Sequence, residues 1–160
     1  MNVEVVRSAR RRKTVQARQV GSVLRVSIPA TMTKADEERW VREMLRRLER
    51  RAAGQAFDLE RRAAALARRY GLRTPSSVRW SDNQVWRWGS CTPSAGTVRL
   101  SSRLLSEPSW VIDYVLVHEL AHLDAPRHDR RFWAIVNRYP LAERARGFLI
   151  ARGLEPVSEP

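Results

Sequence analysis

The 160-residue chain is long enough to bury a hydrophobic core without disulfide bonds. Hydrophobic residues, including six tryptophans, make up 43% of it, which excludes a disordered composition. The net charge of +13 is uneven, because residues 1–80 hold 20 Lys and Arg against 8 Asp and Glu, whereas residues 81–160 hold 10 against 9. The N-terminal half is therefore predicted either to meet phosphates or acidic partners, or to carry a solvated arginine-rich surface.

The sequence shows neither a signal peptide nor a membrane span. The first residues lack an apolar core, and the most apolar stretch, residues 110–120, is short and contains charged side chains. A single cysteine, Cys91, excludes an internal disulfide and fits a reducing compartment. These features predict a cytoplasmic protein with no membrane partner.

Residues 1–30 are predicted to form N-terminal strands. Valines alternate with polar residues in this segment, and Gly21-Ser22 suits a tight hairpin turn. Residues 31–71 are predicted to form two amphipathic helices. The first begins near Thr33 and is interrupted at Gly54, and the second ends at Gly71.

Residues 72–153 are predicted to form the catalytic core, followed by a frayed tail over residues 154–160. Its short strands are expected at 78–80, 85–88 and 97–100. Its helices are expected at 109–122, 129–139 and 141–152. This order of strands, two helices, short strands and more helices predicts a single α+β domain over residues 1–160.

All three histidines of the chain fall within one eleven-residue window, from His118 to His128. His118 and His122 are four residues apart on a predicted helix, so both imidazoles lie on one face and can bind the same tetrahedral zinc ion. Glu119, next to the first ligand, can reach a metal-bound water but not the metal. This H-E-x-x-H arrangement is typical of zinc peptidases.

A third ligand must come from outside this helical turn, and His128 is the first candidate. It follows His122 by six residues, the same step that separates the second and third ligands in the H-E-x-x-H-x-x-G-x-x-H pattern. Pro126 is expected to end the helix and let the chain return His128 to the metal. Ala125 stands where that pattern has glycine, so the turn must differ in detail.

Three other side chains could act as metal ligands. Glu143, on a later helix, is the second candidate for the third ligand, and Asp124 is the third. Asp124 could instead orient an imidazole or face solvent. Cys91 could bind zinc as a thiolate, but no second cysteine accompanies it, which favours a small buried residue.

With zinc held by the three histidines, the sequence predicts a metallopeptidase. Zinc would lower the pKa of a bound water toward about 7 and polarise the scissile carbonyl, while Glu119 would take the water proton and deliver it to the leaving amine. Tyr114, Tyr139 and Arg103 are candidate donors to the oxyanion. A peptide substrate could pair with an exposed strand near residues 97–100.

Five segments along the chain share a pattern with one known family. They are Arg7–Val15, Arg87–Cys91, Val98–Leu100, Asp113–His122, and His128 with Phe132-Trp133. The Trp-Gly-Ser-Cys and His-Glu-Leu-Ala-His stretches are the most specific. On these residues the chain resembles the YgjP-like family of predicted metal-dependent hydrolases, which is related to the SprT-like and WLM metallopeptidases.

The resemblance implies a compact zincin fold, in which a short mixed sheet lies beside an active-site helix. It implies His118, His122 and His128 as metal ligands and Glu119 as the catalytic base. SprT-like relatives act on DNA-bound proteins, which fits the basic N-terminal half. The alternative function is therefore a basic, nucleic-acid-associated zinc protein. A structural zinc usually has four protein ligands, and only three strong candidates are visible, which favours catalysis on a peptide or protein substrate.

Overall fold

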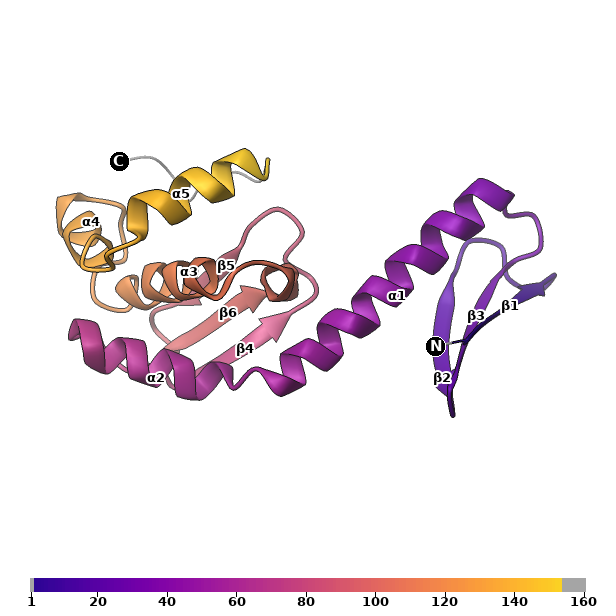
Figure 1. Ribbon diagram of the computed structural model, residues 1–160, viewed down its shortest axis with the longest axis horizontal. Coiled ribbons are helices and arrows are strands. Elements are labelled where there is room, and N and C mark those ends of the chain that lie inside the picture. Colours follow the sequence, from indigo (N-terminus) through magenta and orange to yellow (C-terminus); the bar gives the residue numbers. More distant parts are fainter. Residues whose placement is uncertain (1, 154–160) are drawn as a thin grey trace. The chain divides into compact units, whose positions relative to one another are not determined.

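The computed structural model describes residues 2–153, except for the side chain of Arg51. The described chain forms two three-stranded sheets, five α-helices and one short 3₁₀ helix (Figure 1). The elements fall into two compact units, Met1–Glu49 and Arg50–Pro160. Helix α1 (Lys34–Ala56) contains the boundary between them. The predicted α+β class is confirmed, whereas a single domain over residues 1–160 stays a prediction.

The N-terminal unit is a small sheet covered by the first part of α1. Strand β3 (Val23–Pro29) lies in the centre, parallel to β1 (Asn2–Ser8) and antiparallel to β2 (Gln16–Val20). Gly21, with φ of 59°, makes the predicted hairpin turn between β2 and β3. Alternate residues of β3 are buried and pack against apolar side chains of α1 and its flanks: Met32, Val41, Met44, Leu45 and Leu48.

The second unit begins with helix α2 (Leu59–Tyr70). Asp58 caps its first turn by accepting a hydrogen bond from the Arg61 backbone N–H, and Gly71, in the left-handed conformation, ends it as predicted. A second sheet follows, in which β6 (Thr97–Ser101) lies between β4 (Ser77–Ser81), its parallel neighbour, and β5 (Gly89–Thr92), its antiparallel one.

Four helical segments complete this unit. They are the 3₁₀ helix η1 (Ser102–Ser106), α3 (Ser109–Ala121), α4 (Arg130–Val136) and α5 (Ala142–Ala151). The sequence had predicted slightly longer α-helices in the same places and no 3₁₀ helix. The expected frayed tail over residues 154–160 lies outside the described residues.

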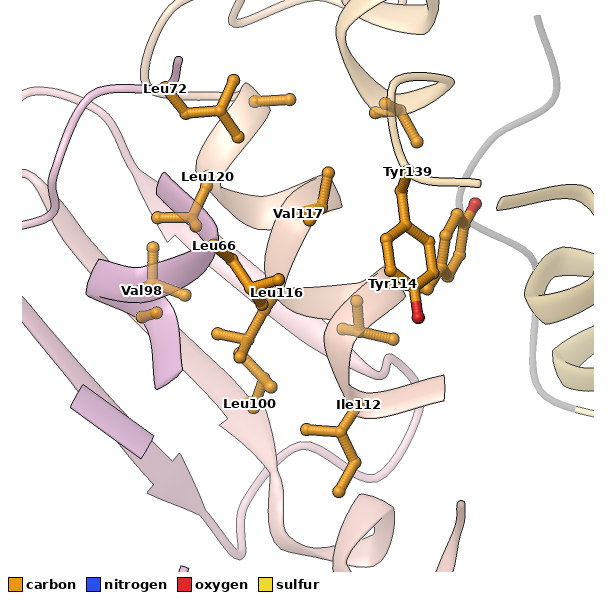
Figure 2. Packing of buried hydrophobic residues seen from close by; sticks show 14 of the residues in the cluster. Leu66, Leu72, Val98, Leu100, Ile112, Tyr114, Leu116, Val117, Leu120 and Tyr139 are labelled. Atoms are coloured by element: carbon orange, nitrogen blue, oxygen red, sulfur yellow. The ribbon is translucent and has the colours of Figure 1, made fainter. Parts of the chain in front are cut away.

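Helix α3 lies at the centre of the core, because every residue from Val111 to Ala121 is buried. It packs against α2, α4, α5 and the second sheet, so it needs no polar face. In Figure 2, Leu116 lies on the side of α3 toward Leu66 of α2, and Tyr114 lies on the opposite side near Tyr139. The polar residues carried by this helix are therefore held in a rigid, desolvated setting.

One partly buried ion pair joins α2 to α3. Both oxygens of the Asp113 carboxylate accept hydrogen bonds from the Arg62 guanidinium, and the Nε–Oδ1 distance is 2.6 Å. The side chain of Asp113 is only 8% exposed, so this bidentate pairing supplies the partner that a buried carboxylate requires.

Within the described residues, no helix is both long enough and apolar enough to cross a membrane.

Two expectations about individual elements were wrong. Helix α1 is not interrupted at Gly54 but continues to Ala56. A Cβ atom at Gly54 would lie 3.2 Å from both Leu105 and Trp80, so this glycine permits a close approach rather than breaking the helix. Residues 85–88 form a loop rather than a strand, and β5 begins only at Gly89.

Side chains bind the first carbonyls of the loop before β5, and the carbonyl of its last residue, Trp88, accepts a hydrogen bond from the Ser101 backbone N–H of β6 at 2.8 Å. The carbonyl of Gln84 accepts a hydrogen bond from the Ser101 hydroxyl, and the carbonyl of Val85 accepts one from Arg103. Residues 97–100 were expected to offer an exposed edge to a substrate. They form the central strand β6 instead, with a neighbour on each side, so that expectation was also wrong.

Candidate active site

The three histidines converge at the C-terminal end of α3. His118 lies in its last turns, His122 follows its last residue, and His128 belongs to the loop before α4. The Nε2 atom of His128 lies 3.3 Å from that of His118 and 3.1 Å from that of His122. The ligand atoms of the three histidines lie within 4.8 Å of one another, so the three side chains could hold one metal ion. No other group of three or more His, Cys, Asp or Glu residues in the described part of the chain could do so.

The chain returns to α3 through a short turn around Pro126. Backbone hydrogen bonds from Leu123, Asp124 and Ala125 to the carbonyls of Leu120 and Ala121 close the end of the helix. Among the described residues only glycines have a positive φ, so Ala125 makes this turn without strain. The Asp129 carboxylate then accepts a hydrogen bond from the Phe132 backbone N–H at 2.9 Å and starts α4.

A single aromatic side chain contacts all three imidazoles. The fully buried ring of Phe132 has its centroid 4.7, 4.5 and 4.6 Å from those of His118, His122 and His128. Trp133 stacks on His128 at a centroid distance of 5.8 Å and an interplanar angle of 27°. These contacts fix the ring orientations before any ligand binds, which is the preorganisation that a catalytic metal site requires.

The environment keeps the imidazoles neutral. Burial, with the neighbouring His122 and His128, holds the pKa of His118 well below its usual value. Burial and His128 also lower the pKa of His122, against hydrogen bonds to the Pro126 and Ala125 backbone that raise it, and burial lowers the pKa of His128. Neutral imidazole is the form that binds a metal ion.

Glu119 lies beside the first histidine and is almost completely buried, with 5% of its surface exposed. Burial raises the pKa of its carboxyl group to about 8, against the opposing influence of the Arg87 charge. The backbone of Gly89, the first residue of β5, lies directly against this side chain. A Cβ atom at Gly89 would lie 2.5 Å from Oε1 of Glu119 and 2.7 Å from its Cγ.

A family model for the YgjP-like metallopeptidase domain matches residues 7–149 of the chain. The chain belongs to the YgjP-like metallopeptidase family. The resemblance noted in the sequence is therefore confirmed, and the protein is a metal-dependent hydrolase of the peptidase class. A search of the curated proteins found no match.

This YgjP-like chain is similar to a solved structure, that of the metallopeptidase zymogen of Pyrococcus abyssi abylysin. The TM-score is 0.55 at 23% sequence identity, and the likeness covers 61% of this chain and 98% of the abylysin chain. At this level of identity the similarity establishes a common fold. It agrees with the expected fold of a small mixed sheet beside a central helix.

A metallopeptidase family implies a divalent metal, and the chemistry of the histidine cluster fits one. Three neutral imidazoles that converge through Nε2 match the ligands of catalytic zinc sites, which have three protein ligands and one open position. The second nitrogen of His118, Nδ1, is buried and has no hydrogen-bond partner among the described residues. The His118 ring is therefore oriented by packing and not by a hydrogen bond through Nδ1.

The rival third ligands of the YgjP-like chain do not join the cluster. Glu143, in the first turn of α5, has a side chain that is 71% exposed and pairs with Arg146 at 2.8 Å. Asp124 accepts a hydrogen bond from the Arg73 backbone N–H at 3.1 Å and ties the segment after α2 to the end of α3. Cys91 is partly exposed on β5, and burial together with the charge of Glu119 raises the pKa of its thiol to about 11.

The three candidate oxyanion donors differ in what they already bind. The Tyr139 hydroxyl donates to the Trp110 carbonyl at 2.9 Å, and Arg103 donates to the Val85 carbonyl at 2.9 Å. The Tyr114 hydroxyl is buried with no hydrogen-bond partner among the described residues, and burial raises its pKa to about 12. Its ring centroid lies 6.3 Å from that of His118, so Tyr114 keeps an uncommitted donor in the vicinity of the cluster.

Two contacts of the YgjP-like site were missed by reasoning from the sequence. The packing of Gly89 on Glu119 joins residues 30 positions apart. The only local signal was a glycine where the chain passes from a loop into a strand, which often marks a close backbone approach. The contact of Phe132 with all three imidazoles had no signal beyond the apolar character of this residue.

Proposed function

We propose that the protein is a zinc metallopeptidase in which His118, His122 and His128 hold the metal and Glu119 is the general base. The observation that carries this proposal is the convergence of three Nε2 atoms beside a buried glutamate that belongs to none of the ion pairs of the described residues. Family membership supports the peptidase class. The assignment of each residue rests on geometry and donor chemistry.

Zinc is the metal that suits these ligands best. Magnesium and calcium prefer oxygen ligands, whereas imidazole suits zinc and the later transition metals. When bound, zinc supplies a Lewis acid that polarises a carbonyl group and lowers the pKa of water toward about 7. The apolar packing around His118 and Phe132 strengthens such electrostatic effects, because it excludes water from one side of the cluster.

Glu119 would move the protons of the reaction. As a carboxylate it removes a proton from the attacking water, and as a carboxylic acid it returns that proton to the leaving amine. A group that must act in both directions works best when its pKa lies near the working pH, and burial raises the pKa of Glu119 toward that range. Its position against Gly89 limits the directions in which the carboxylate can point.

We further infer that an extended peptide substrate pairs with β5. This strand is at the edge of the second sheet and has β6 as its one neighbour there, so its other edge is available for strand addition. Because β5 begins at Gly89, beside Glu119, a peptide paired with it would pass close to the general base. Strand β6 cannot pair with a substrate, because it already has β4 on one side and β5 on the other.

Three proteins test the proposed function: wild type, Glu119→Gln and His128→Ala. Zinc content is measured by elemental analysis. Hydrolysis is measured with an unfolded protein as the substrate. Glu119→Gln is expected to keep about one zinc per chain and lose turnover, because the amide cannot accept the proton. His128→Ala is expected to lose zinc and activity together. Hydrolysis by Glu119→Gln at the wild-type rate would refute the general-base role, and a zinc-loaded wild type without hydrolysis would refute the peptidase.

A second candidate function, nucleic-acid binding, is favoured by one surface of the N-terminal unit. A pocket of about 410 Å³ on α1 is lined by the half-exposed Trp40, Glu43 and three arginines: Arg39, Arg42 and Arg46. Arginine can contact phosphates while an aromatic ring stacks on a base. We infer that this surface could bring the peptidase to nucleic-acid-bound proteins.

Titration of a fluorescent single-stranded DNA at several salt concentrations tests this surface. Affinity should fall steeply with salt if phosphates are contacted, and Arg42→Gln should reduce both affinity and the salt slope. Arg61→Gln, on α2 and outside this pocket, is the matched control. No binding at low salt would remove the second function and leave the peptidase proposal intact.

A further inference from the structure

A pocket of about 570 Å³ lies beside His128, on the face of α4. It is lined by His128, Asp129, Arg130, Trp133, Ala134 and Asn137. Its volume falls within the range of small-ligand sites, roughly 300–1,000 Å³. Because it shares His128 with the histidine cluster, a group bound here would be held next to the proposed metal.

The lining combines exposed hydrogen-bond donors with an apolar wall. Trp133 and Ala134 supply apolar surface, and the Trp133 ring is held in place by stacking on His128. Arg130 and Asn137, both exposed, supply hydrogen-bond donors. The one acidic lining residue, Asp129, directs its carboxylate to the backbone N–H of Phe132, where it caps α4.

Residues 127–131 carry three arginines against one aspartate, so this segment has a net positive charge. Arg127, Arg130 and Arg131 are all exposed, and none of them has an ion-pair partner among the described residues. Nearby carboxylates are engaged elsewhere: Asp124 with Arg73, and Glu143 with Arg146. Arg130 is the one of the three arginines that lines the pocket.

We propose that this pocket binds a carboxylate of the peptide substrate and that Arg130 determines this specificity. The guanidinium group of arginine presents paired N–H donors that match a carboxylate, and the Asn137 amide can add a further donor. The Trp133 ring can pack against the methylene groups that precede a glutamate carboxylate. This inference rests on the proposed function, in which the neighbouring His128 is a ligand of the catalytic metal.

The same chemistry could come from an Asp or Glu side chain or from the C-terminal carboxylate of a substrate. A set of otherwise neutral peptides separates the two sources. In one series a single Glu is moved through every position, with a Gln peptide as the partner at each step. In a second series the C-terminus is either free or amidated. Wild type, Arg130→Gln and Arg131→Gln are compared as zinc-loaded proteins.

Wild type is expected to prefer the carboxylate peptide over its neutral partner by tenfold or more in kcat/KM at one position. Arg130→Gln should bring this ratio close to one. Arg131→Gln, which removes the same charge one residue away but outside the pocket, should keep the ratio. Equal rates for both members of every pair in wild type, or an equal loss of preference in both variants, would overturn the proposal.

A binding measurement keeps this test separate from the proposed function. The peptides are titrated by calorimetry into two proteins, the Glu119→Gln variant and the double variant Glu119→Gln with Arg130→Gln. Their affinities measure the carboxylate preference without turnover. If wild type cleaved no peptide yet the carboxylate peptides bound through Arg130, the peptidase proposal would fail and the anion site would stand. Zinc content and the midpoint of thermal unfolding, both equal to wild type, verify that Arg130→Gln is folded.

Discussion

Replacing Gly89 by alanine tests whether the backbone of β5 sets the position of the general base. The new Cβ atom would lie 2.5 Å from Oε1, 2.7 Å from Cγ and 2.8 Å from Cδ of Glu119, whereas ordinary van der Waals contact begins at 3.4 Å. The carboxylate must therefore move by roughly 0.6–0.9 Å, or β5 must move away from α3. A misplacement of about 1 Å in an active site can lower the rate by about 10²-fold.

We expect kcat/KM of Gly89→Ala to fall about 100-fold in a peptide hydrolysis assay, while zinc content stays near one per chain because the three atoms nearest the new Cβ all belong to Glu119. Gly147→Ala is the matched control, because nothing lies within 4 Å of its new Cβ atom. That variant should keep full activity and gain slightly in stability, as alanine is the better helix former. Activity of Gly89→Ala within twofold of wild type would refute the proposed positioning of Glu119 by β5.

Three further predictions concern the metal, the pH dependence and the packing of the site. Glu143→Gln should keep the zinc that His128→Ala loses, as measured by elemental analysis; loss of zinc from the Glu143 variant would make Glu143 a ligand. In metal-free protein the raised pKa of Glu119, about 8, means that the folded chain holds a proton that the unfolded chain has lost. Relative to Glu119→Gln, the wild-type free energy of unfolding in urea should therefore fall by about 1.5–2 kcal/mol between pH 6.5 and pH 8, because the unfolded histidines also lose protons in this range but do so in both proteins. Phe132→Ala should lower the free energy of unfolding by about 3–5 kcal/mol and weaken zinc binding, since the buried ring contacts all three imidazoles; unchanged zinc affinity would show that this ring does not orient them.

The histidine cluster could be predicted from sequence because its geometry is almost entirely local. The spacing of His118 and His122 places them on one helix face, and the turn at Pro126 returns His128 to them. Local reasoning could not decide against Glu143, since its distance from the cluster depends on how α5 packs on α3. The structure leaves Glu143 exposed and paired with Arg146.

Errors in the element boundaries arose where tertiary contacts override local preference. The alternation at residues 85–88 resembles a strand, yet the Arg103 side chain binds the Val85 carbonyl and regular pairing with β6 begins only at Gly89. Gly54 lowers helix propensity, yet α1 continues through it to Ala56, and the close packing of Trp80 and Leu105 against this position accounts for the glycine. Neither contact is visible from the neighbouring sequence.

The burial of Glu119 and of His118 has opposite consequences for metal binding and for catalysis. In metal-free protein both groups favour their neutral forms, which suits the histidine as a ligand but leaves the glutamate protonated over much of the neutral range. A divalent cation at the histidines would favour the carboxylate, because a bound cation is the largest local charge in such a site. Under the proposed function, Glu119 would then become competent as a general base only in the metal-loaded protein. Metal occupancy would thus be coupled to the protonation state of Glu119, because the same buried helix carries Glu119 and His118.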